Sequence, residues 1–313
     1  MRVVFIGNAP WSVPSLEAVA TSPHEIVLVV TRAPRPAGRG NRPAPTPVAE
    51  AARRLGLPLQ EVETVKSGRG FEALSQAAPD VLAVVAYGEI LPKAVLDLPV
   101  VAAVNVHFSL LPQLRGAAPV QRAILEGHAV TGVTTIRMDE GMDTGPILLQ
   151  GEEATSPEDD GGSLGERLAG LGGLLLVETL DRLEAGSLVE RPQDDARATY
   201  APKLKTEDRI IDWSQPAASI ARRVRALAPE PGASATFRGK NLKLRTVSLA
   251  PPPQPGNDVV QEPGRLKPQR GGVGVWTGDG FLMLEEVQPE GRRRMSGAEF
   301  VMGYRPEIGE QLG

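Results

Sequence analysis

The sequence predicts an α/β protein with two domains, a doubly wound and mainly parallel sheet followed by a smaller β-rich domain. Its 313 residues exceed the size at which one hydrophobic core stops growing, so two cores are expected. The first half alternates short β-branched runs with helical stretches, which is typical of a parallel sheet covered by helices. The last third instead alternates short strands with turns.

The expected strands of the first domain are short apolar runs separated by helical segments. The strands cover Val3 to Ile6, Ile26 to Thr31, Asp80 to Val85, Val101 to Val106 and Val133 to Met138, and the helices begin near Pro14, Pro47, Phe71 and Pro119. In such a sheet, ligands bind beyond the carboxyl ends of the strands. We therefore expect functional residues directly after the apolar runs.

A long Leu-rich segment is expected to close the first domain as a helix. It runs from Ser163 to Glu184, and Ser163 and Glu166 have the spacing of a capping box. Residues 186–212 have the character of a connector. The expected organisation is a first domain over residues 1–189, a linker over 190–208 and a second domain over 209–313.

The second domain is predicted to be a small β barrel that follows a helix around Arg222 to Leu227. A Pro-rich excursion over residues 251–256 cannot join a central strand and is expected to be a surface loop. Ser296 and Glu299 form a capping box ahead of a short terminal helix. The expected strands are Ala233 to Phe237, Leu242 to Val247 and Phe281 to Val287.

The composition excludes several classes of site. Without cysteine there is no disulfide, thiolate metal site or cysteine nucleophile, and the three histidines are too scattered for a zinc site, so no metal is expected. Neither a dinucleotide fingerprint nor a phosphate-binding loop is present. The amino-terminal apolar run stops at Gly7, too early for a signal peptide or a membrane span. We expect a soluble, cytoplasmic protein with no membrane partner.

The charge is unevenly distributed along the chain. The net charge is −4, but residues 1–201 hold 17 basic and 25 acidic side chains, whereas residues 202–313 hold 17 and 13. A basic second domain is expected to meet an anionic partner such as nucleic acid, although a solvated basic face gives the same count. The run Arg292 to Arg294 is open to the same two interpretations.

Polar side chains that could carry chemistry follow two of the expected strands. Asn105 and His107 are two residues apart, so in an extended chain they point to the same side. The strand that ends near Met138 leads into a loop rich in glycine and aspartate, which includes Asp143. We expect this loop to bring Asp143 beside His107.

An amide, an imidazole and a carboxylate suit acyl transfer to an amine when the acyl group arrives already activated. Asn105 and His107 can donate to the oxygen that becomes negative in the tetrahedral intermediate, which contributes roughly a few kcal/mol per donor. Asp143 would fix the tautomer of His107 and keep it a proton donor. On the residues alone, a structural histidine and a turn-forming aspartate remain alternatives. His24 and His128 are expected at the surface.

The same residues belong to a longer pattern that resembles the 10-formyltetrahydrofolate-dependent formyltransferase family. The pattern comprises Asn105-Val106-His107, Ser109-Leu110-Leu111-Pro112, Arg115-Gly116, Gly132-Val133-Thr134 and Met138-Asp139-Glu140-Gly141-Met142-Asp143-Thr144-Gly145. The resemblance implies a Rossmann-like first domain with Asn105, His107 and Asp143 as catalytic residues. It implies 10-formyltetrahydrofolate as co-substrate, bound by Ser109, Leu110, Leu111 and Pro112 and by a pocket wall that includes Tyr87, Gly88 and Leu91.

Over nearly the whole chain, the resemblance is to the members of that family that act on methionyl-tRNA. Its further marks are Pro36-Ala37-Gly38-Arg39-Gly40, Thr199-Tyr200-Ala201-Pro202-Lys203-Leu204, Ile211-Asp212-Trp213-Ser214, Arg223-Val224-Arg225-Ala226-Leu227 and Gln288-Pro289-Glu290-Gly291. The resemblance implies that initiator methionyl-tRNA contacts Arg39 and Arg42, with Trp11 near the methionine, and that the second domain is an OB-like barrel with a basic surface for the RNA. A monomer without a DNA partner is expected.

Three other activities remain as alternatives. The same catalytic residues serve an enzyme that formylates an amino sugar or a nucleotide amine, or one that hydrolyses formyl-folate. A chain of this fold can also bind RNA without catalysis. The basic second domain disfavours the first two, and the presence of Asn105, His107 and Asp143 together disfavours the third.

Overall fold

The computed structural model describes residues 1–37, 42–253, 262–269 and 271–313. Contacts between Cα atoms divide the chain into two compact units. The N-terminal unit comprises Met1–Pro119, Ala129–Thr155 and Gly165–Pro202, and the C-terminal unit comprises Val120–His128, Ser156–Leu164 and Lys203–Gly313. The C-terminal unit thus includes two segments that precede the connector in the chain.

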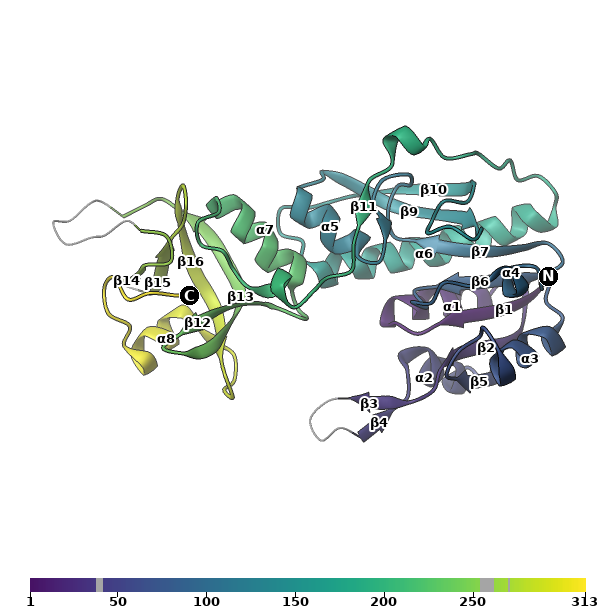
Figure 1. The fold of residues 1–313 in the computed structure, drawn as a ribbon, viewed down its shortest axis with the longest axis horizontal. Coiled ribbons are helices and arrows are strands. Elements are labelled where there is room, and N and C mark those ends of the chain that lie inside the picture. The colour runs from purple at the N-terminus through teal and green to yellow at the C-terminus, as the bar shows by residue number, and fades with distance from the viewer. Residues whose placement is uncertain (38–41, 254–261, 270) are drawn as a thin grey trace. The chain divides into compact units, whose positions relative to one another are not determined.

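The N-terminal unit is built on one large sheet (Figure 1). Within the described residues it has seven strands in the order β10-β9-β7-β6-β1-β2-β5, and β9 runs antiparallel to both of its neighbours. The strands are β1 (Arg2–Gly7), β2 (Glu25–Arg32), β5 (Leu59–Val62), β6 (Val81–Val85), β7 (Ala102–His107), β9 (Val130–Arg137) and β10 (Ile147–Ala154). The predicted, mainly parallel sheet is confirmed. The two edge strands β5 and β10 were not predicted, because half-exposed strands lack a continuous apolar run.

Helices cover both faces of this sheet. On one face, α3 and α4 contribute Leu74 and Val95 to a buried cluster with Val4 and Leu82 of the strands. On the other face lies α6, where a Cβ added to Gly172 would come 3.0 Å from Val106 of β7. The helices of this half of the fold are α1 (Val13–Ala20), α2 (Pro47–Arg54), α3 (Gly68–Ala77), α4 (Lys93–Leu96) and α6 (Gly161–Glu184), whose first residues belong to the C-terminal unit. Helix α5 (Pro119–Glu126) falls almost entirely in the C-terminal unit.

The start of α6 differs from the predicted capping box. The helix begins at Gly161, and one carboxylate oxygen of Asp160 accepts the backbone N–H groups of Gly162 and Ser163, both at 2.8 Å. Ser163 is the third helical residue, and its hydroxyl accepts the backbone N–H of Asp160 at 3.1 Å. The prediction that pairs Ser163 with Glu166 is wrong. A charged carboxylate is a stronger acceptor than a hydroxyl and also favours the positive end of the helix dipole.

Two segments outside the large sheet contain predicted site residues or bear on the site. After β2, the strands β3 (Arg35–Ala37) and β4 (Arg42–Ala44) form an antiparallel hairpin. Arg42 opens β4, and Arg39 lies outside the described residues. Farther along, β11 (Tyr200–Ala201) pairs in parallel with β8 (Arg115–Gly116).

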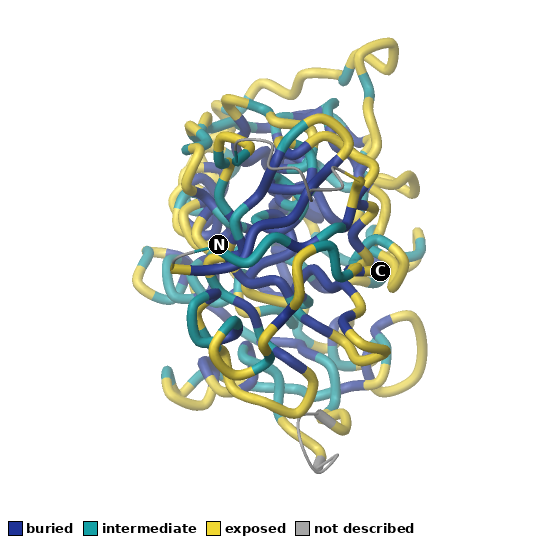
Figure 2. Tube along the Cα trace, turned by 90° about the vertical axis from the view of Figure 1, so that its left-hand side faces the viewer, coloured by how far each residue is buried: buried dark blue, intermediate teal, exposed yellow. Residues whose placement is uncertain are grey.

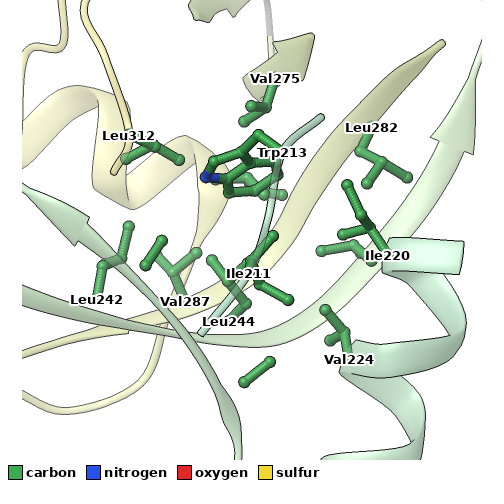
Figure 3. Close-up of a cluster of buried hydrophobic side chains, with 14 of the residues drawn as sticks. Ile211, Trp213, Ile220, Val224, Leu242, Leu244, Val275, Leu282, Val287 and Leu312 are labelled. Carbon is green, nitrogen blue, oxygen red and sulfur yellow. The ribbon is translucent and has the colours of Figure 1, made fainter. Parts of the chain in front are cut away.

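The C-terminal unit has an antiparallel sheet in the order β12-β13-β16-β15-β14, with β17 on β16. Helix α7 packs Ile220 and Val224 into a core that also contains Trp213 and Leu312 (Figure 3). The capping box of Ser296 and Glu299 is confirmed at the start of α8. The elements are α7 (Ala217–Leu227), β12 (Ala233–Phe237), β13 (Lys240–Ala250), β14 (Leu266–Gln269), β15 (Gly272–Trp276), β16 (Phe281–Pro289), β17 (Met295–Ser296) and α8 (Gly297–Tyr304).

The antiparallel second domain is confirmed, but a closed barrel is not. In the described part of the chain, the edge strands β12 and β14 are not paired with each other. The last residues of the chain instead reach both edges, since Leu312 bridges Phe237 and Gln311 bridges Arg265. The sheet is therefore open in its strand order, with a non-strand segment between its edges.

Buried residues lie inside the chain trace, and the exposed ones lie mainly on its outer turns (Figure 2). His24 departs from its prediction as a surface residue, because it is only 5% exposed, with Nε2 3.2 Å from Asp181 and Nδ1 3.7 Å from Glu184. These carboxylates at the end of α6 offer polar partners that make burial of the ring possible. His128 is partly exposed beside Glu126. No helix in the described ranges combines the length and the apolar character needed to cross a bilayer.

Candidate active site

Strand β7 carries the amide and the imidazole of the predicted site at the carboxyl-terminal edge of the sheet. Asn105 and His107 are two residues apart on the strand, so their side chains point to the same side of the sheet. His107 is the last residue of β7, and its side chain is only 6% exposed. The edge position was predicted from the apolar run that precedes these residues.

The two ring nitrogens of His107 have different partners. Nε2 lies 2.9 Å from the carbonyl oxygen of Leu114, and Nδ1 lies 3.5 Å from a carboxylate oxygen of Asp143. Because a carbonyl can only accept a hydrogen bond, Nε2 carries a hydrogen. Nδ1 is therefore the nitrogen that faces the carboxylate.

Asp143 is held by groups from two other segments. One carboxylate oxygen accepts the backbone N–H of Gly116 at 2.8 Å, and the other lies 3.4 Å from Nδ2 of Asn105. Its backbone has a φ of +56°, in the left-handed region that non-glycine residues seldom adopt. The structure thus brings together Asn105, His107 and Asp143, as the sequence predicts.

A different aspartate forms the turn in the same loop. One carboxylate oxygen of Asp139 accepts the backbone N–H of Gly141 at 3.0 Å and the hydroxyl of Thr144 at 2.7 Å. This is the local bonding typical of a turn-forming aspartate. Asp143 instead bonds across the sheet edge to groups far away in sequence, which argues against a purely local role.

The segment from Ser109 to Pro112 is a tightly bonded turn beside β9. The hydroxyl of Thr134 donates to the carbonyl of Ser109 at 2.6 Å and accepts the backbone N–H of Leu111 at 3.1 Å. The amide of Gln150 donates to the carbonyl of Leu111 at 2.9 Å. The hydroxyl of Ser109 donates to the carbonyl of Gln113, and Leu110 and Pro112 are partly exposed.

The segment after β6 buries two of its three predicted ligand-binding residues. The side chains of Tyr87 and Leu91 belong to the cluster beneath α3 and α4, whereas Gly88 is exposed with a φ of +76°. Burial, together with the negative charge of Glu89, raises the pKa of the Tyr87 phenol. The guanidinium of Arg32 lies over the ring, 5.6 Å from its centroid.

Asn8 joins the carboxyl ends of three strands, a role that the sequence did not reveal. Its side-chain oxygen accepts the hydroxyl of Thr31 and the backbone N–H of Arg32, and its amide donates to the carbonyl of Tyr87. These contacts lie where β1 meets β6, the switch point of the sheet. Trp11 follows, with its ring against the edge of Phe108 and across Gly165 of α6.

Two residues with direct bearing on the Asp143 loop were also missed. Gln193 donates its amide to the loop, and Arg115 donates to Gln193. Arg115 stood in a recognised motif, but Gln193 lies in a polar connector where no periodicity marks it. Among the described residues, no group of three or more His, Cys, Asp or Glu side chains could hold a metal ion.

Two family models together account for most of the chain. The model described as formyl transferase matches residues 1–180, and the model of the formyl transferase C-terminal domain matches residues 203–305. The matches fall on both sides of the connector that contains Gln193.

Solved structures with similar folds have low sequence identity to this chain. HypX from Aquifex aeolicus in complex with tetrahydrofolic acid has a TM-score of 0.64 and 18% identity, with coverage of 99% of this chain and 48% of HypX. The N-formyltransferase from Helicobacter canadensis has a TM-score of 0.65 and 17% identity, with coverage of 92% and 98%. At these identities the likeness concerns the fold.

Curated relatives match over the full length. The methionyl-tRNA formyltransferase of Solibacter usitatus is 45% identical over 316 residues, which cover 100% of this chain and 99% of the relative. The methionyl-tRNA formyltransferase of Thermus thermophilus is 45% identical over 313 residues with the same coverage. The chain therefore belongs to the formyl transferase family, among the methionyl-tRNA formyltransferases.

Proposed function

We propose that this protein transfers the formyl group of 10-formyltetrahydrofolate to the α-amino group of initiator methionyl-tRNA, which gives N-formylmethionyl-tRNA for translation initiation. The observation that carries the proposal is the convergence of Asn105, His107 and Asp143 at the carboxyl edge of the sheet. Relatives of the same length, named for this reaction, support the choice of acceptor.

The chemistry follows from the partners of each side chain. The amine attacks the formyl carbon, and the oxygen that gains negative charge requires donors already in place. Asn105 offers an amide N–H. Because Nε2 of His107 keeps its hydrogen on the carbonyl of Leu114, Nδ1 donates when the ring is protonated. Asp143 stabilises positive charge on His107 and holds the ring in one orientation. The amine loses a proton as the C–N bond to the folate breaks, and the folate nitrogen gains one.

We assign the folate to the turn and the segment beside these residues. The backbone of Ser109, Leu110, Leu111 and Pro112, fixed by its hydrogen bonds to β9 and β10, supplies a preformed surface for the pterin. The segment after β6 supplies the pocket wall through the exposed backbone of Gly88, with Tyr87 and Leu91 anchoring the wall from the core.

We assign the RNA to the hairpin and to the second domain. Arg39 and Arg42 contact the acceptor end, and Trp11 lies near the methionine. We retain the organisation of residues 1–189 as catalytic domain, 190–208 as linker and 209–313 as an OB-like RNA-binding domain, and we propose that the protein acts as a cytoplasmic monomer. The bridges from Leu312 and Gln311 to the two sheet edges support the OB-like description.

The test is transfer of a labelled formyl group. The full chain is incubated with labelled 10-formyltetrahydrofolate and initiator methionyl-tRNA, and label is followed into the aminoacyl ester. We expect incorporation only when the methionine is esterified to the RNA. Incorporation into amino-sugar nucleotides instead, or release of free formate without an acceptor, would contradict the proposal, and absence of both turnover and transfer would favour the non-catalytic RNA-binding alternative.

A further inference from the structure

One side chain of the connector (residues 186–212) holds the backbone of the Asp143 loop, which comprises residues 138–146 between β9 and β10. Nε2 of Gln193 donates to the carbonyl oxygens of Asp143, at 2.8 Å, and of Gly145, at 2.7 Å. Both hydrogens of the amide are thus used on the same loop. Gln193 is partly buried and lies about fifty positions along the chain from its partners, so this contact is tertiary rather than local.

The amide of Gln193 is itself oriented by a buried charge. Its oxygen accepts two N–H groups of the Arg115 guanidinium, at 3.0 and 2.8 Å, which fixes which end of the amide faces the loop. The side chain of Arg115 is 3% exposed and also pairs with Asp195 at 2.7 Å. Because an amide donates at one end and accepts at the other, Gln193 can join an arginine to two carbonyls, which glutamate cannot.

The loop needs such support because Asp143 has an unfavourable backbone conformation. A non-glycine residue at a φ of +56° persists only where surrounding contacts over-determine it. Gly116, the residue that follows Arg115 in the chain, donates its backbone N–H to the Asp143 carboxylate. Gln193 therefore holds the backbone of Asp143 while Gly116 holds its carboxylate, and Arg115 orients Gln193.

The same connector also supports the partner of His107. The hydroxyl of Thr199 accepts the backbone N–H of Leu114 at 2.9 Å, and the carbonyl of Thr199 accepts that of Arg115 at 2.9 Å. Leu114 has a φ of +59° and presents the carbonyl that binds Nε2 of His107. The connector thus supports the surroundings of both His107 and Asp143.

We infer that Gln193, oriented by Arg115, is a positioning residue for the formyl transfer, which holds Asp143 in the geometry that faces His107. This inference rests on the proposed function for its effect on turnover, but its structural content concerns only the Asp143 loop. Without the two hydrogen bonds from Gln193, the carboxylate moves relative to the imidazole, and a misplacement of about 1 Å is enough to cost about 100-fold in rate.

The decisive variant is Gln193→Glu in the full chain, compared with wild type. Glutamate keeps the oxygen that Arg115 binds but lacks the N–H groups for the carbonyls of Asp143 and Gly145. We expect kcat to fall about 10- to 100-fold, with the KM values for 10-formyltetrahydrofolate and methionyl-tRNA within about threefold of wild type. If Gln193 served only to attach the connector through Arg115, Gln193→Glu would keep kcat within threefold, and the inference would be wrong.

Glu190→Ala is the matched control. Glu190 lies in the same connector and pairs with Arg137 at 2.7 Å, and no hydrogen bond or ion pair joins it to the described residues of the Asp143 loop. Its kcat should equal that of wild type. A loss equal to that of Gln193→Glu would mean that any loosening of the connector matters, which would overturn the specific role.

A second readout separates this inference from the proposed function. The chain has three histidines, so the ring signals of His107 can be followed by NMR beside those of His24 and His128. Gln193→Glu should shift the His107 signals alone, whereas Glu190→Ala should shift none. A shift in a protein that shows no formyl transfer would refute the function and keep the positioning role, and unchanged His107 signals would refute the positioning role.

Discussion

At the scale of single residues, the site depends on which partner each polar atom of its side chains has. His107 directs Nε2 to a backbone carbonyl and leaves Nδ1 for Asp143. The loop contains two aspartates within hydrogen-bonding reach of backbone N–H groups, but only Asp143 faces the imidazole. Sequence spacing cannot separate the two carboxylates, whereas their partners do.

Asp143→Asn should lower kcat by two or more orders of magnitude, because a neutral amide cannot stabilise positive charge on His107. His107→Ala should have an effect of similar size. Folate binding, measured by fluorescence titration with a non-reactive folate, should change little in either variant. Asp139→Asn is the control, since it alters the same loop at its turn-forming carboxylate, and its turnover should stay within a few-fold of wild type. Near-normal turnover of Asp143→Asn would refute the site assignment.

At the scale of elements, helix ends and chain segments set positions that no periodic pattern reveals. The N-terminus of α6 begins with two glycines, which are poor helix formers, and it is held by Asp160 rather than by Ser163 and Glu166. The connector with Gln193 lacks apolar periodicity, because it is fastened by polar contacts. Local propensity therefore located the elements better than it located their ends.

Removal of the α6 cap by Asp160→Ala should lower the free energy of unfolding by about 1 kcal/mol, because two backbone N–H groups lose their acceptor. Urea denaturation followed by circular dichroism measures the change. Glu166→Ala is the matched control, because Glu166 is exposed and does not cap the helix, and it should stay within about 0.5 kcal/mol of wild type. A larger loss of stability in Glu166→Ala than in Asp160→Ala would instead support the capping box predicted from the sequence.

The C-terminal segment offers a pH-dependent test of its contact with the turn after β12. Hydrogen bonds from Arg238 hold the pKa of Glu310 below its ordinary value of 4.5. A lowered carboxyl pKa adds stability that is fully present above pH 4.5 and is lost as the pH falls through the folded-state pKa. Arg238→Gln should therefore be less stable than wild type at pH 7, and the difference should shrink below pH 4. Thermal unfolding at both pH values checks this, and a constant difference would contradict it.

At the scale of the whole molecule, charge is divided between the two parts of the chain. Residues 202–313 carry an excess of basic side chains, whereas residues 1–201 carry an excess of acidic ones. Such a division suits an enzyme that binds a polyanion with one part and performs chemistry with the other. In the function that we propose, residues of the N-terminal unit alone bind the folate.

The KM for methionyl-tRNA should therefore rise steeply with salt, while the KM for folate changes little. Each phosphate contact contributes roughly 0.7 to 0.9 to the log–log slope of affinity against salt concentration. Arg42→Ala should reduce that slope by about 1 if its side chain binds a phosphate. Steady-state kinetics at several potassium chloride concentrations measure both slopes, and equal slopes for the two substrates would exclude an electrostatic RNA surface.

The sequence by itself determined the α/β class, the strands of the sheet interior, the antiparallel second domain and the residue types at the site, because these follow from periodicity and from motifs that are local in the chain. Only the tertiary structure decided that Asp143 and not Asp139 faces His107, that Gln193 supports the loop, that His24 is buried and that the strand order of the second sheet is open. Each of these depends on contacts between segments far apart in sequence. Such polar contacts depend on how the elements pack, and they leave no periodic signal in the residues that they join.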